Sequence, residues 1–358
     1  MSSQKIKDIV KLSNAYRMAL EMSEVVVNLA GLEPTLWKEN NNNVIDLIKE
    51  LRSNGCTVEM TTNGSRLKDL YEDFIKAGLS KCRVSIHSFN RNTYKNITGK
   101  DTLPSVLEGI RRCKDSSLKI VINRTLLNGF TDDIYQGLSF VQEENLTLKL
   151  YDLWWVPRTE KRYAQYYVGC DEIVKKYVLP ITVESIKKST EFQRSRILYK
   201  LKDGGYVDVK YFDESLHGNF EICNSCFVQS KCKESFGSYV HIFSNGNLTF
   251  CNLREDIHFD LESLLLKDAS ENEIAWFLKY KFDELLGESW KKYIKSSALR
   301  FYINETCNFR CCFPNTKPDY NSLWCLSSVR TKEMWNINYP ELLPNESEKK
   351  GVDLWDRK

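Results

Sequence analysis

The alternation of apolar, strand-like runs with helix-like segments constrains the fold of this chain more than any other feature. Short runs rich in β-branched residues are each followed by a polar turn and then by apolar residues at helical spacing. This unit predicts βα repeats and a parallel sheet, whose buried strands are expected to be continuously apolar. The predicted strands are 25–29, 58–62, 83–87, 118–123 and 146–153, and the predicted helices are 5–22, 44–51, 67–77, 103–112 and 134–141.

Right-handed crossovers would place these helices on one side of the sheet and curl it toward a partial barrel. Ligands of such sheets bind at the carboxyl ends of the strands. At those ends, Gly31 permits close backbone approach, and Glu33 and Asn63 offer an acceptor and an amide for an amino acid or a ribose. Ser85 and Asn123 could hold the hydroxyls of a sugar. The pattern predicts a site for a polar small molecule, although such residues are also common in turns.

Eight of the twelve cysteines form two groups. Because the cytosol keeps thiols reduced, clustered cysteines in a cytoplasmic protein indicate metal or reactive thiols rather than disulfides. The isolated residues Cys56, Cys82, Cys113 and Cys170 are predicted to be small buried hydrophobic residues. The first group is Cys223, Cys226, Cys232 and Cys251, and the second is Cys307, Cys311, Cys312 and Cys325.

The spacing of each group suits a metal centre. A two-residue gap lets Cys223 and Cys226 reach one metal from a tight turn, and Cys251 ends a predicted hairpin over 239–243 and 248–251. Four such thiolates suit a tetrahedral zinc or a four-iron cluster, and the spacing does not choose between them. The second group directly follows an apolar run over 299–303, so a predicted strand delivers thiolates into one loop, and soft ligands of this kind select iron–sulfur clusters or zinc.

The charge distribution excludes some partners. The 51 basic and 48 acidic residues are interspersed and leave a net charge of only +3, so duplex nucleic acid is not an expected partner. The first eight residues lack the apolar core of a signal peptide, and no run approaches the roughly 20 apolar residues that span a bilayer. We therefore expect a cytoplasmic protein with no membrane partner.

Several segments carry a resemblance to a known family. They are 28–34, 61–64, 84–88 with Tyr94, Ile97, Thr98 and Gly99, and 122–129. Together they resemble the radical S-adenosylmethionine (radical SAM) enzymes, and within them the GTP cyclase of molybdenum-cofactor synthesis and its relatives. The similarity covers most of 5–157 and, separately, 299–313, while 223–253 resembles the auxiliary-cluster region of such enzymes.

The resemblance implies a partial (βα)6 barrel with a parallel sheet, extended by a small cysteine-rich α+β part. Its cofactors would be S-adenosylmethionine and one or two 4Fe-4S clusters, the first held by three cysteines, here matched by Cys307, Cys311 and Cys312. A deoxyadenosyl radical would abstract hydrogen from a small-molecule, nucleotide or peptide substrate, with a reductase or flavodoxin-type protein as electron donor. By position, Gly31, Glu33 and Pro34 match the motif that meets the methionine amino group, and Thr62, Asn63, Ser85 and Asn123 would hold the rest of the cofactor.

The chain departs from the family pattern in order and in ligands. The cysteine loop comes last instead of first, which a circular permutation or a fusion of two truncated copies would explain. Pro314 stands where the family has its third cysteine, so Cys312 substitutes, Cys325 folds back, or the catalytic cluster is absent. Leu32 replaces the second glycine of the glycine-glycine-glutamate-proline motif, and the chain ends without the paired glycines of the molybdenum-cofactor enzyme.

These observations predict five regions and two possible functions. The regions are a barrel over 1–157, an auxiliary cysteine-rich region over 158–270, a helical connector over 271–297, the first strand and cluster loop over 298–325, and an irregular tail over 326–358. The leading hypothesis is a radical SAM enzyme. The alternative is a non-catalytic metal-binding protein on a degenerate barrel, with zinc or an iron–sulfur cluster at the first cysteine group.

Overall fold

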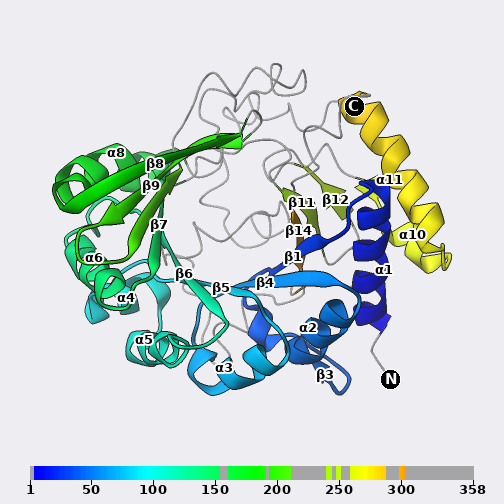
Figure 1. Cartoon of the computed structure of the whole chain (residues 1–358), viewed down its shortest axis with the longest axis horizontal. Coiled ribbons are helices and arrows are strands. Elements are labelled where there is room, and N and C mark those ends of the chain that lie inside the picture. The colour runs from blue at the N-terminus through cyan, green and yellow to red at the C-terminus, as the bar shows by residue number, and fades with distance from the viewer. Residues whose placement is uncertain are drawn as a thin grey trace.

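The computed structural model describes residues 4–153, 160–190, 193–210, 239–243, 247–250, 259–287 and 298–303. These residues form one large mixed sheet that bends into an open arc, with helices on its outer side (Figure 1). The predicted α/β class with a parallel sheet is confirmed. The segments 211–238, 251–258 and 304–358 lie outside the described residues, and with them most of the predicted cysteine-rich extension and the tail.

The main sheet has twelve strands within the described residues, and its central eight run parallel. Antiparallel strands extend it at both edges. In sheet order, the strands are β13 (Phe259–Asp260), β12 (Asn247–Thr249), β11 (Tyr239–Ile242), β14 (Ala298–Tyr302), β1 (Val25–Ala30), β4 (Cys56–Thr62), β5 (Lys81–Ser85), β6 (Lys119–Thr125), β7 (Thr147–Tyr151), β10 (Tyr206–Lys210), β9 (Gln193–Leu201) and β8 (Thr182–Thr190). A separate small sheet pairs β2 (Lys38–Glu39) with β3 (Asn42–Asn43).

The last described strand of the chain occupies the first place in the barrel series. Strand β14 pairs in parallel with β1, in the register Leu29 to Phe301 and Ala30 to Tyr302. The order β14, β1, β4, β5, β6, β7 is therefore that of six successive barrel strands, although β14 comes some 270 residues after β1 in the sequence. The apolar run that the sequence analysis predicts as a strand over 299–303 is thus a strand, and residues 299–302 pair with residues 27–30. The five-region division of the chain stays a prediction.

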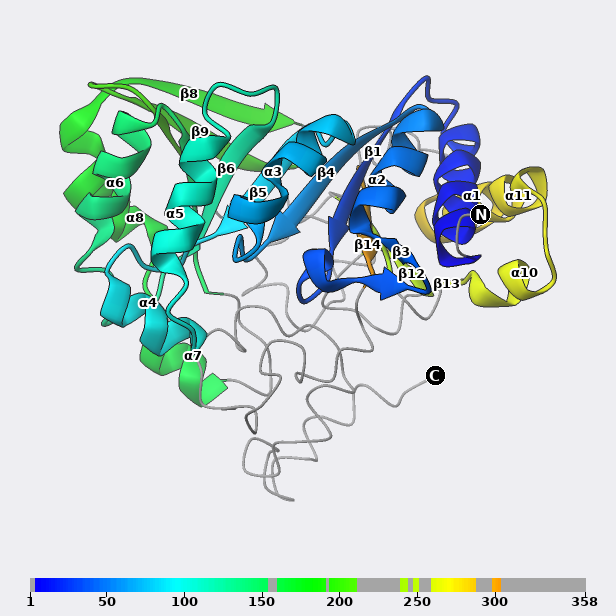
Figure 2. The same cartoon turned by 90° about the horizontal axis from the view of Figure 1, so that it is seen from below.

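Helices cover the outer face of the arc, and Figure 2 shows them stacked along it from α6 to α1. The polar residues before α2 cap it as expected: Asn43 accepts from the backbone of Ile45, and Asp46 accepts from the backbone of Asn43. The helices are α1 (Gln4–Ala19), α2 (Val44–Ser53), α3 (Leu67–Lys76), α4 (Arg91–Thr98), α5 (Leu103–Arg112), α6 (Ile134–Glu143), α7 (Glu160–Tyr166), α8 (Cys170–Ile173), α10 (Glu262–Leu266) and α11 (Glu271–Leu286), with the short turns η1 (Pro34–Leu36), η3 (Val174–Val178) and η4 (Leu179–Ile181).

The sequence pattern missed helix α4. Only Tyr94 and Ile97 of its eight residues are buried, so its apolar spacing is too sparse to reveal a helix. Its N-terminus is capped by the side chain of Asn90, and Gly99 ends it in the left-handed conformation.

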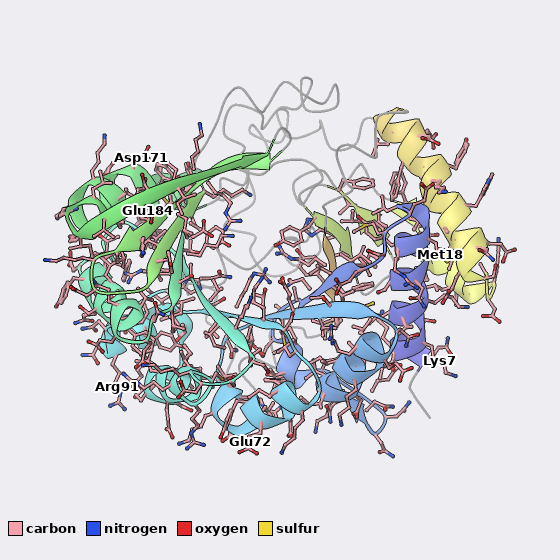
Figure 3. The ribbon with its side chains drawn as sticks, viewed as in Figure 1. Lys7, Met18, Glu72, Arg91, Asp171 and Glu184 are labelled. Atoms are coloured by element: carbon pink, nitrogen blue, oxygen red, sulfur yellow. The ribbon has the colours of Figure 1, made fainter. Side chains whose placement is uncertain are left out.

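The two faces of the sheet differ in chemistry. Outward side chains such as Val84, Ile122 and Leu150 are buried under the helices, and the alternate inward positions are polar and partly exposed. The expectation of continuously apolar strands is therefore wrong for β5 and β7, because no second apolar layer covers their inner face among the described residues. Figure 3 shows charged side chains such as Glu72 and Arg91 on the outside of the helix layer.

The four isolated cysteines are buried in the outer layer, as predicted. Burial raises the pKa of Cys56 and of Cys113 to about 11, so both thiols stay protonated at neutral pH. None of the described helices is long and apolar enough to cross a bilayer.

Candidate functional site

The carboxyl ends of the parallel strands meet at one edge of the sheet. Because β14, β1, β4, β5 and β6 are successive neighbours, the residues at their ends share that edge. The structure therefore brings together the strand-end residues that the sequence singled out. In sheet order they are Ile303, Gly31 with Glu33, Thr62 with Asn63, Ser85 and Asn123.

Gly31 allows the closest approach between two of these strands. Its φ is +94°, and a Cβ there would lie 3.2 Å from the backbone of both Tyr302 and Ile303. The backbone N–H of Ile303 donates to the carbonyl of Ala30 at 3.1 Å. A side chain at Gly31 would be strained and would push β14 away. Ile303, the last described residue before the segment of the sequence that carries Cys307, Cys311 and Cys312, therefore lies beside Gly31.

Glu33 is a buried carboxylate that joins the loops after β1 and β4. Only 1% of it is exposed. Its Oε1 accepts from the hydroxyls of Thr35 and Thr62, at 2.6 Å each, and from the backbone N–H of Thr35 at 3.1 Å. Its Oε2 accepts from the backbone N–H of Asn63 at 2.7 Å. The side chain of Glu33 is thus bonded to the protein through both oxygens, and it fixes the shape of the strand-end edge.

The neighbouring predicted residues also shape the turns. Pro34 is the first residue of η1, which Glu33 caps. The hydroxyl of Thr62 accepts from the backbone of Gly64 at 3.1 Å, and the side-chain oxygen of Asn63 accepts from the backbone of Ser65 at 2.8 Å. The turn-forming role of these residues, which the sequence left open beside ligand binding, is therefore present in the structure.

Asn123 is the strand-end residue whose side chain is least satisfied. It lies in register with Ser85 on the inner face, and its Oδ1 is buried without a hydrogen-bond donor among the described residues. A buried acceptor of this kind is costly unless a donor reaches it. The hydroxyls of a ribose are such donors, so this position fits the sugar of S-adenosylmethionine.

The seven predicted cluster ligands, Cys223, Cys226, Cys232, Cys251, Cys307, Cys311 and Cys312, lie outside the described residues. Within the described ranges, no group of three or more histidine, cysteine or acidic side chains is placed to hold a metal. The fit of a cluster therefore depends on the donor chemistry of the loop after β14. Thiolates there are the ligands that an iron–sulfur cluster requires.

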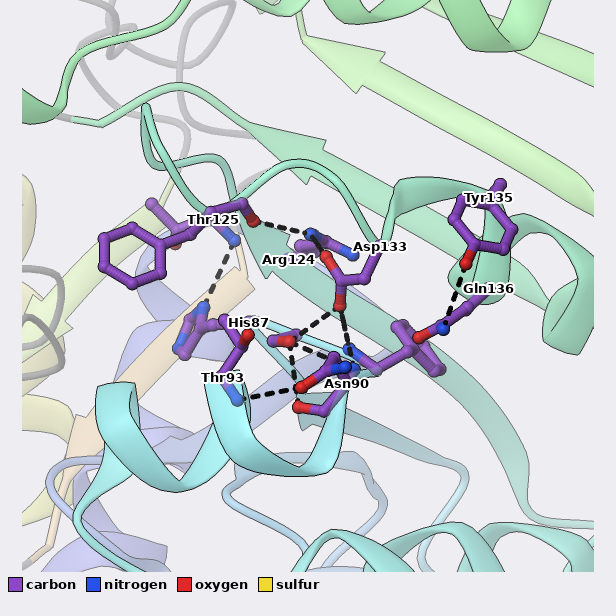
Figure 4. A network of polar contacts seen from close by, with 11 residues as sticks. His87, Asn90, Thr93, Arg124, Thr125, Asp133, Tyr135 and Gln136 are labelled. Carbon is purple, nitrogen blue, oxygen red and sulfur yellow. Dashed lines mark hydrogen bonds and ion pairs between the residues drawn. The ribbon is translucent and has the colours of Figure 1, made fainter.

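A second polar network lies beneath the same edge and includes residues that the sequence did not assign (Figure 4). Arg124, with 0% exposure, forms an ion pair with Asp133 and donates to the carbonyl of Phe130 at 3.1 Å. Asp133 also accepts from Ser88 Oγ at 2.6 Å and from the backbone of Asn90 at 3.0 Å. Burial raises the pKa of the Asp133 carboxyl, but the charge of Arg124 and the hydrogen bonds from Ser88, Arg124 and Asn90 together outweigh burial, so the pKa lies below its usual range.

His87 belongs to this network as a neutral side chain. Its Nδ1 accepts from the backbone N–H of Thr125 at 3.2 Å, which joins the loops after β5 and β6. It is 7% exposed, and burial, with a smaller effect of the Arg124 charge, lowers the pKa of His87 to about 4. His87 is therefore a structural histidine.

The inner face of the arc carries a cluster of cations and phenols that sequence reasoning missed. The guanidinium of Arg300 on β14 lies 3.8 Å from the centre of the Tyr239 ring on β11, and its Nε donates to Asn28 Oδ1 at 3.1 Å. Lys149 on β7 lies 5.2 Å from the ring of Tyr151. Neither Lys149 nor Arg300 has a carboxylate partner within the described ranges.

The carboxylates of this face are already paired. Glu59 on β4 binds Lys81 and Arg83, both at 2.5 Å, and Asp208 on β10 binds Arg196. One nitrogen of Arg83, Nη1, remains buried without an acceptor among the described residues. The inner face therefore has an excess of positive charge in its middle. The sequence does contain an indication of this charge cluster. Polar residues occupy every second position of β5 and β7, and alternate residues of a strand lie on the same face of the sheet.

Charges from strands far apart in the sheet act together on Tyr239. Burial alone would raise the pKa of its phenol, but Arg300, Arg83 and Lys149 outweigh burial and lower the pKa to about 8. Strand β7 is six strands from β11, which is roughly 29 Å along the sheet at its usual spacing. The curvature of the arc is what brings their side chains close enough to interact.

Comparison with known proteins finds similarity to one superfamily. Residues 3–139 match the model of the radical SAM superfamily. The chain resembles that superfamily over these residues. It is 28% identical to a "Probable GTP 3',8-cyclase" of Thermococcus kodakarensis over 272 residues, which cover 75% of this chain and 82% of that protein. It is 27% identical to the protein of the same description from Metallosphaera sedula over 271 residues, covering 75% and 78%.

Two solved radical SAM structures resemble it more distantly. The crystal structure of archaeal TYW1 matches with a TM-score of 0.34 and 19% identity, over 49% of this chain and 61% of that one. The structure of Streptococcus suis SuiB bound to S-adenosylmethionine matches with a TM-score of 0.43 and 15% identity, over 74% and 59%. The cofactors that the sequence resemblance implied, a 4Fe-4S cluster and S-adenosylmethionine, are those of this superfamily.

Proposed function

We propose that this protein is an enzyme that cleaves S-adenosylmethionine reductively and uses the deoxyadenosyl radical to abstract hydrogen from an anionic small molecule, of which a nucleotide is the leading candidate. The observation that carries the reaction class is the match of residues 3–139 to the radical SAM superfamily. The bound cofactors supply the electron and the radical. The residues of this chain bind and orient them and the substrate.

The strand-end edge is the proposed cofactor site. Gly31, Glu33 and Pro34 form the turn that would meet the methionine amino group, and Glu33 holds this turn against Asn63. Thr62, Ser85 and Asn123 line the same edge, and the unsatisfied Asn123 Oδ1 supports a hydroxyl ligand. Cys307, Cys311 and Cys312 are the proposed ligands of the first cluster, because they follow β14 in the sequence and β14 ends at this edge.

The cationic inner face supports the substrate class. Lys149 and Arg300 have no carboxylate partner in the described ranges, and one nitrogen of Arg83 lacks an acceptor there. An anionic group bound among them would replace solvent with charge-assisted hydrogen bonds. The similarity to proteins described as probable GTP 3',8-cyclases supports a nucleotide.

Anaerobic reconstitution tests the proposal. With iron, sulfide and reductant, the protein is expected to bind at least four irons and to convert S-adenosylmethionine to deoxyadenosine, and GTP is expected to raise the rate. A flavodoxin with its reductase should replace the chemical reductant. No cluster and no cleavage would reject the proposal, and zinc without iron would favour the non-catalytic alternative.

Paired cysteine variants identify the ligands. Cys307→Ala and Cys311→Ala should lose the first cluster and all deoxyadenosine formation. Cys113→Ala removes a thiol that is buried in the outer layer and should keep both. Cys223→Ala and Cys226→Ala should remove only the second metal, whose identity as iron or zinc follows from elemental analysis. Equal iron in Cys307→Ala and the unchanged protein would exclude the loop after β14 as the cluster site.

A further inference from the structure

Tyr239 lies in the middle of the cationic inner face, and its surroundings are set by strands on both sides of the arc. The Arg300 guanidinium covers its ring at 3.8 Å. Its ring neighbours that of His241 on the same strand at 6.0 Å, and His241 in turn shares a hydrogen bond of 3.2 Å with the hydroxyl of Tyr302. The charged and titratable groups that face this cluster are Glu59 on β4, Arg83 on β5, Lys149 and Tyr151 on β7, Arg196 on β9, His241 on β11, and Arg300 and Tyr302 on β14.

This environment favours a negative charge on the phenol. The carboxylates nearby are committed, Glu59 to Lys81 and Arg83, and Asp208 to Arg196. Arg300 and Lys149 have no carboxylate partner in the described ranges, and the phenol of Tyr239 carries the ring that the Arg300 guanidinium covers, so it is a group that can become their counter-charge. Against the opposing effect of burial, Arg300, Arg83 and Lys149 lower the pKa of Tyr239 to about 8. Burial also opposes a rise in the pKa of Arg300, but the phenols of Tyr239, Tyr302 and Tyr151 in turn raise that pKa.

We propose that Tyr239 couples anion binding to proton uptake: in mildly alkaline solution its phenolate neutralises Arg83, Lys149 and Arg300 in the free protein, and a bound anion takes over that role while the phenol takes a proton from water. This rests on the anionic substrate class of the proposed function. The step is a proton transfer alone, with no change of oxidation state. The neutral phenol then donates its O–H to the anion, which makes Tyr239 a positioning residue for the substrate.

The coupling has a defined direction with pH. A bound anion offsets the cations that favour the phenolate, and burial then raises the pKa of Tyr239 toward or above its usual value. Anion affinity should be independent of pH below about pH 7 and should fall up to tenfold per unit above about pH 8. A site made of arginine and lysine alone would show no such decline until lysine itself loses its proton, at about pH 10.

The test uses the full chain and inorganic triphosphate as the probe. Tyrosinate absorbance should show one phenol titrating near pH 8 in the free protein, absent in Tyr239→Phe and present in Tyr135→Phe, which removes an exposed phenol. Because triphosphate has an ionisation of its own in this pH range, the proton count is taken as the difference between the unchanged protein and Tyr239→Phe. Calorimetry in buffers of different ionisation enthalpy should show that the unchanged protein takes up close to one proton more per triphosphate than Tyr239→Phe at about pH 9, with close to no difference at about pH 7. Tyr239→Phe should bind triphosphate with only the proton change of the probe itself.

Several results would overturn the inference. They are an equal proton uptake by Tyr239→Phe and the unchanged protein in mildly alkaline solution, a free protein without a phenol titrating near pH 8, and failure of triphosphate to bind. Arg300→Gln provides a second variant, in which the phenol should titrate at higher pH, and an unchanged titration would also contradict the inference. Failure of the proposed function appears separately, as an absence of deoxyadenosine, because neither titration nor triphosphate binding needs a cluster.

Discussion

The backbone N–H of Asn63 donates to Glu33 Oε2 at 2.7 Å, and this bond joins the loops that follow two neighbouring strands of the sheet. Three further bonds from Thr35 and Thr62 occupy Oε1 of the same carboxylate. Glu33 thus organises the edge at which the cofactor is proposed to bind, and it does so through contacts within the protein.

Replacing Glu33 by Gln should lower the free energy of unfolding by about 2 kcal/mol. In Glu33→Gln the side-chain NH2 group would face one of the present hydrogen-bond donors and could not accept from it. The neutral amide also lacks the negative charge that strengthens the hydrogen bonds to Glu33. Chemical denaturation measures the change, and binding of S-adenosylmethionine measured by calorimetry should weaken with it. Glu143→Gln, at an exposed site, should change stability by no more than about 0.5 kcal/mol. Equal effects of the two substitutions would contradict the role given to Glu33.

Gly31→Ala should destabilise the protein more than Gly129→Ala. Both glycines have positive φ, +94° and +81°, so alanine meets a similar backbone strain of about 1 kcal/mol at each. Only at Gly31 does the new Cβ also press on the backbone of Tyr302 and Ile303, whereas nothing lies within 4 Å at Gly129. Thermal denaturation of both variants measures the difference. If their midpoints agree, β14 does not pack against Gly31 as described.

Because Arg124 and Asp133 form a buried ion pair, replacing one partner should lower the free energy of unfolding strongly. Replacing both should lower it by less than the sum of the two single losses. Arg124→Met leaves a buried carboxylate without its cation, which should cost about 3 to 5 kcal/mol. In the double variant with Asp133→Asn, the total should be smaller than the sum of the two single losses. Arg91→Met breaks an exposed pair with Asp101 and should cost at most about 1 kcal/mol. Additive losses in the double variant would argue against the pair.

The buried His87 predicts a dependence of stability on pH. Its folded pKa of about 4 lies below its usual value of 6.5, so the unfolded chain binds a proton that the folded protein excludes between these values. Above about pH 6.5 the protonation of His87 does not reduce the free energy of unfolding. As the pH drops to about 4, this protonation lowers the free energy of unfolding by up to about 3 kcal/mol. His87→Asn keeps an acceptor for Thr125 and should flatten the stability curve in this window. A slope that is unchanged in His87→Asn would assign it to other groups.

The local pattern of apolar residues was sufficient to predict the strands of the sheet and most helices of the outer layer. Each predicted strand and helix from 5 to 153 has a counterpart in the structure, because one face of every element packs in an apolar layer and apolar periodicity records that face. Helix α4 escaped because it buries only two residues, Tyr94 and Ile97. The resemblance of the strand-end segments also located the edge at which the cofactor residues gather.

The sequence by itself determined the βα order, the isolated buried cysteines and the resemblance to the radical SAM superfamily. The tertiary structure decided the rest, because those features depend on contacts between distant segments. Only the folded sheet places β14 beside β1 and so brings Ile303 to Gly31. Only its curvature brings Arg83 and Lys149 within electrostatic reach of Tyr239, since strands that are far apart along a flat sheet cannot share one charge cluster.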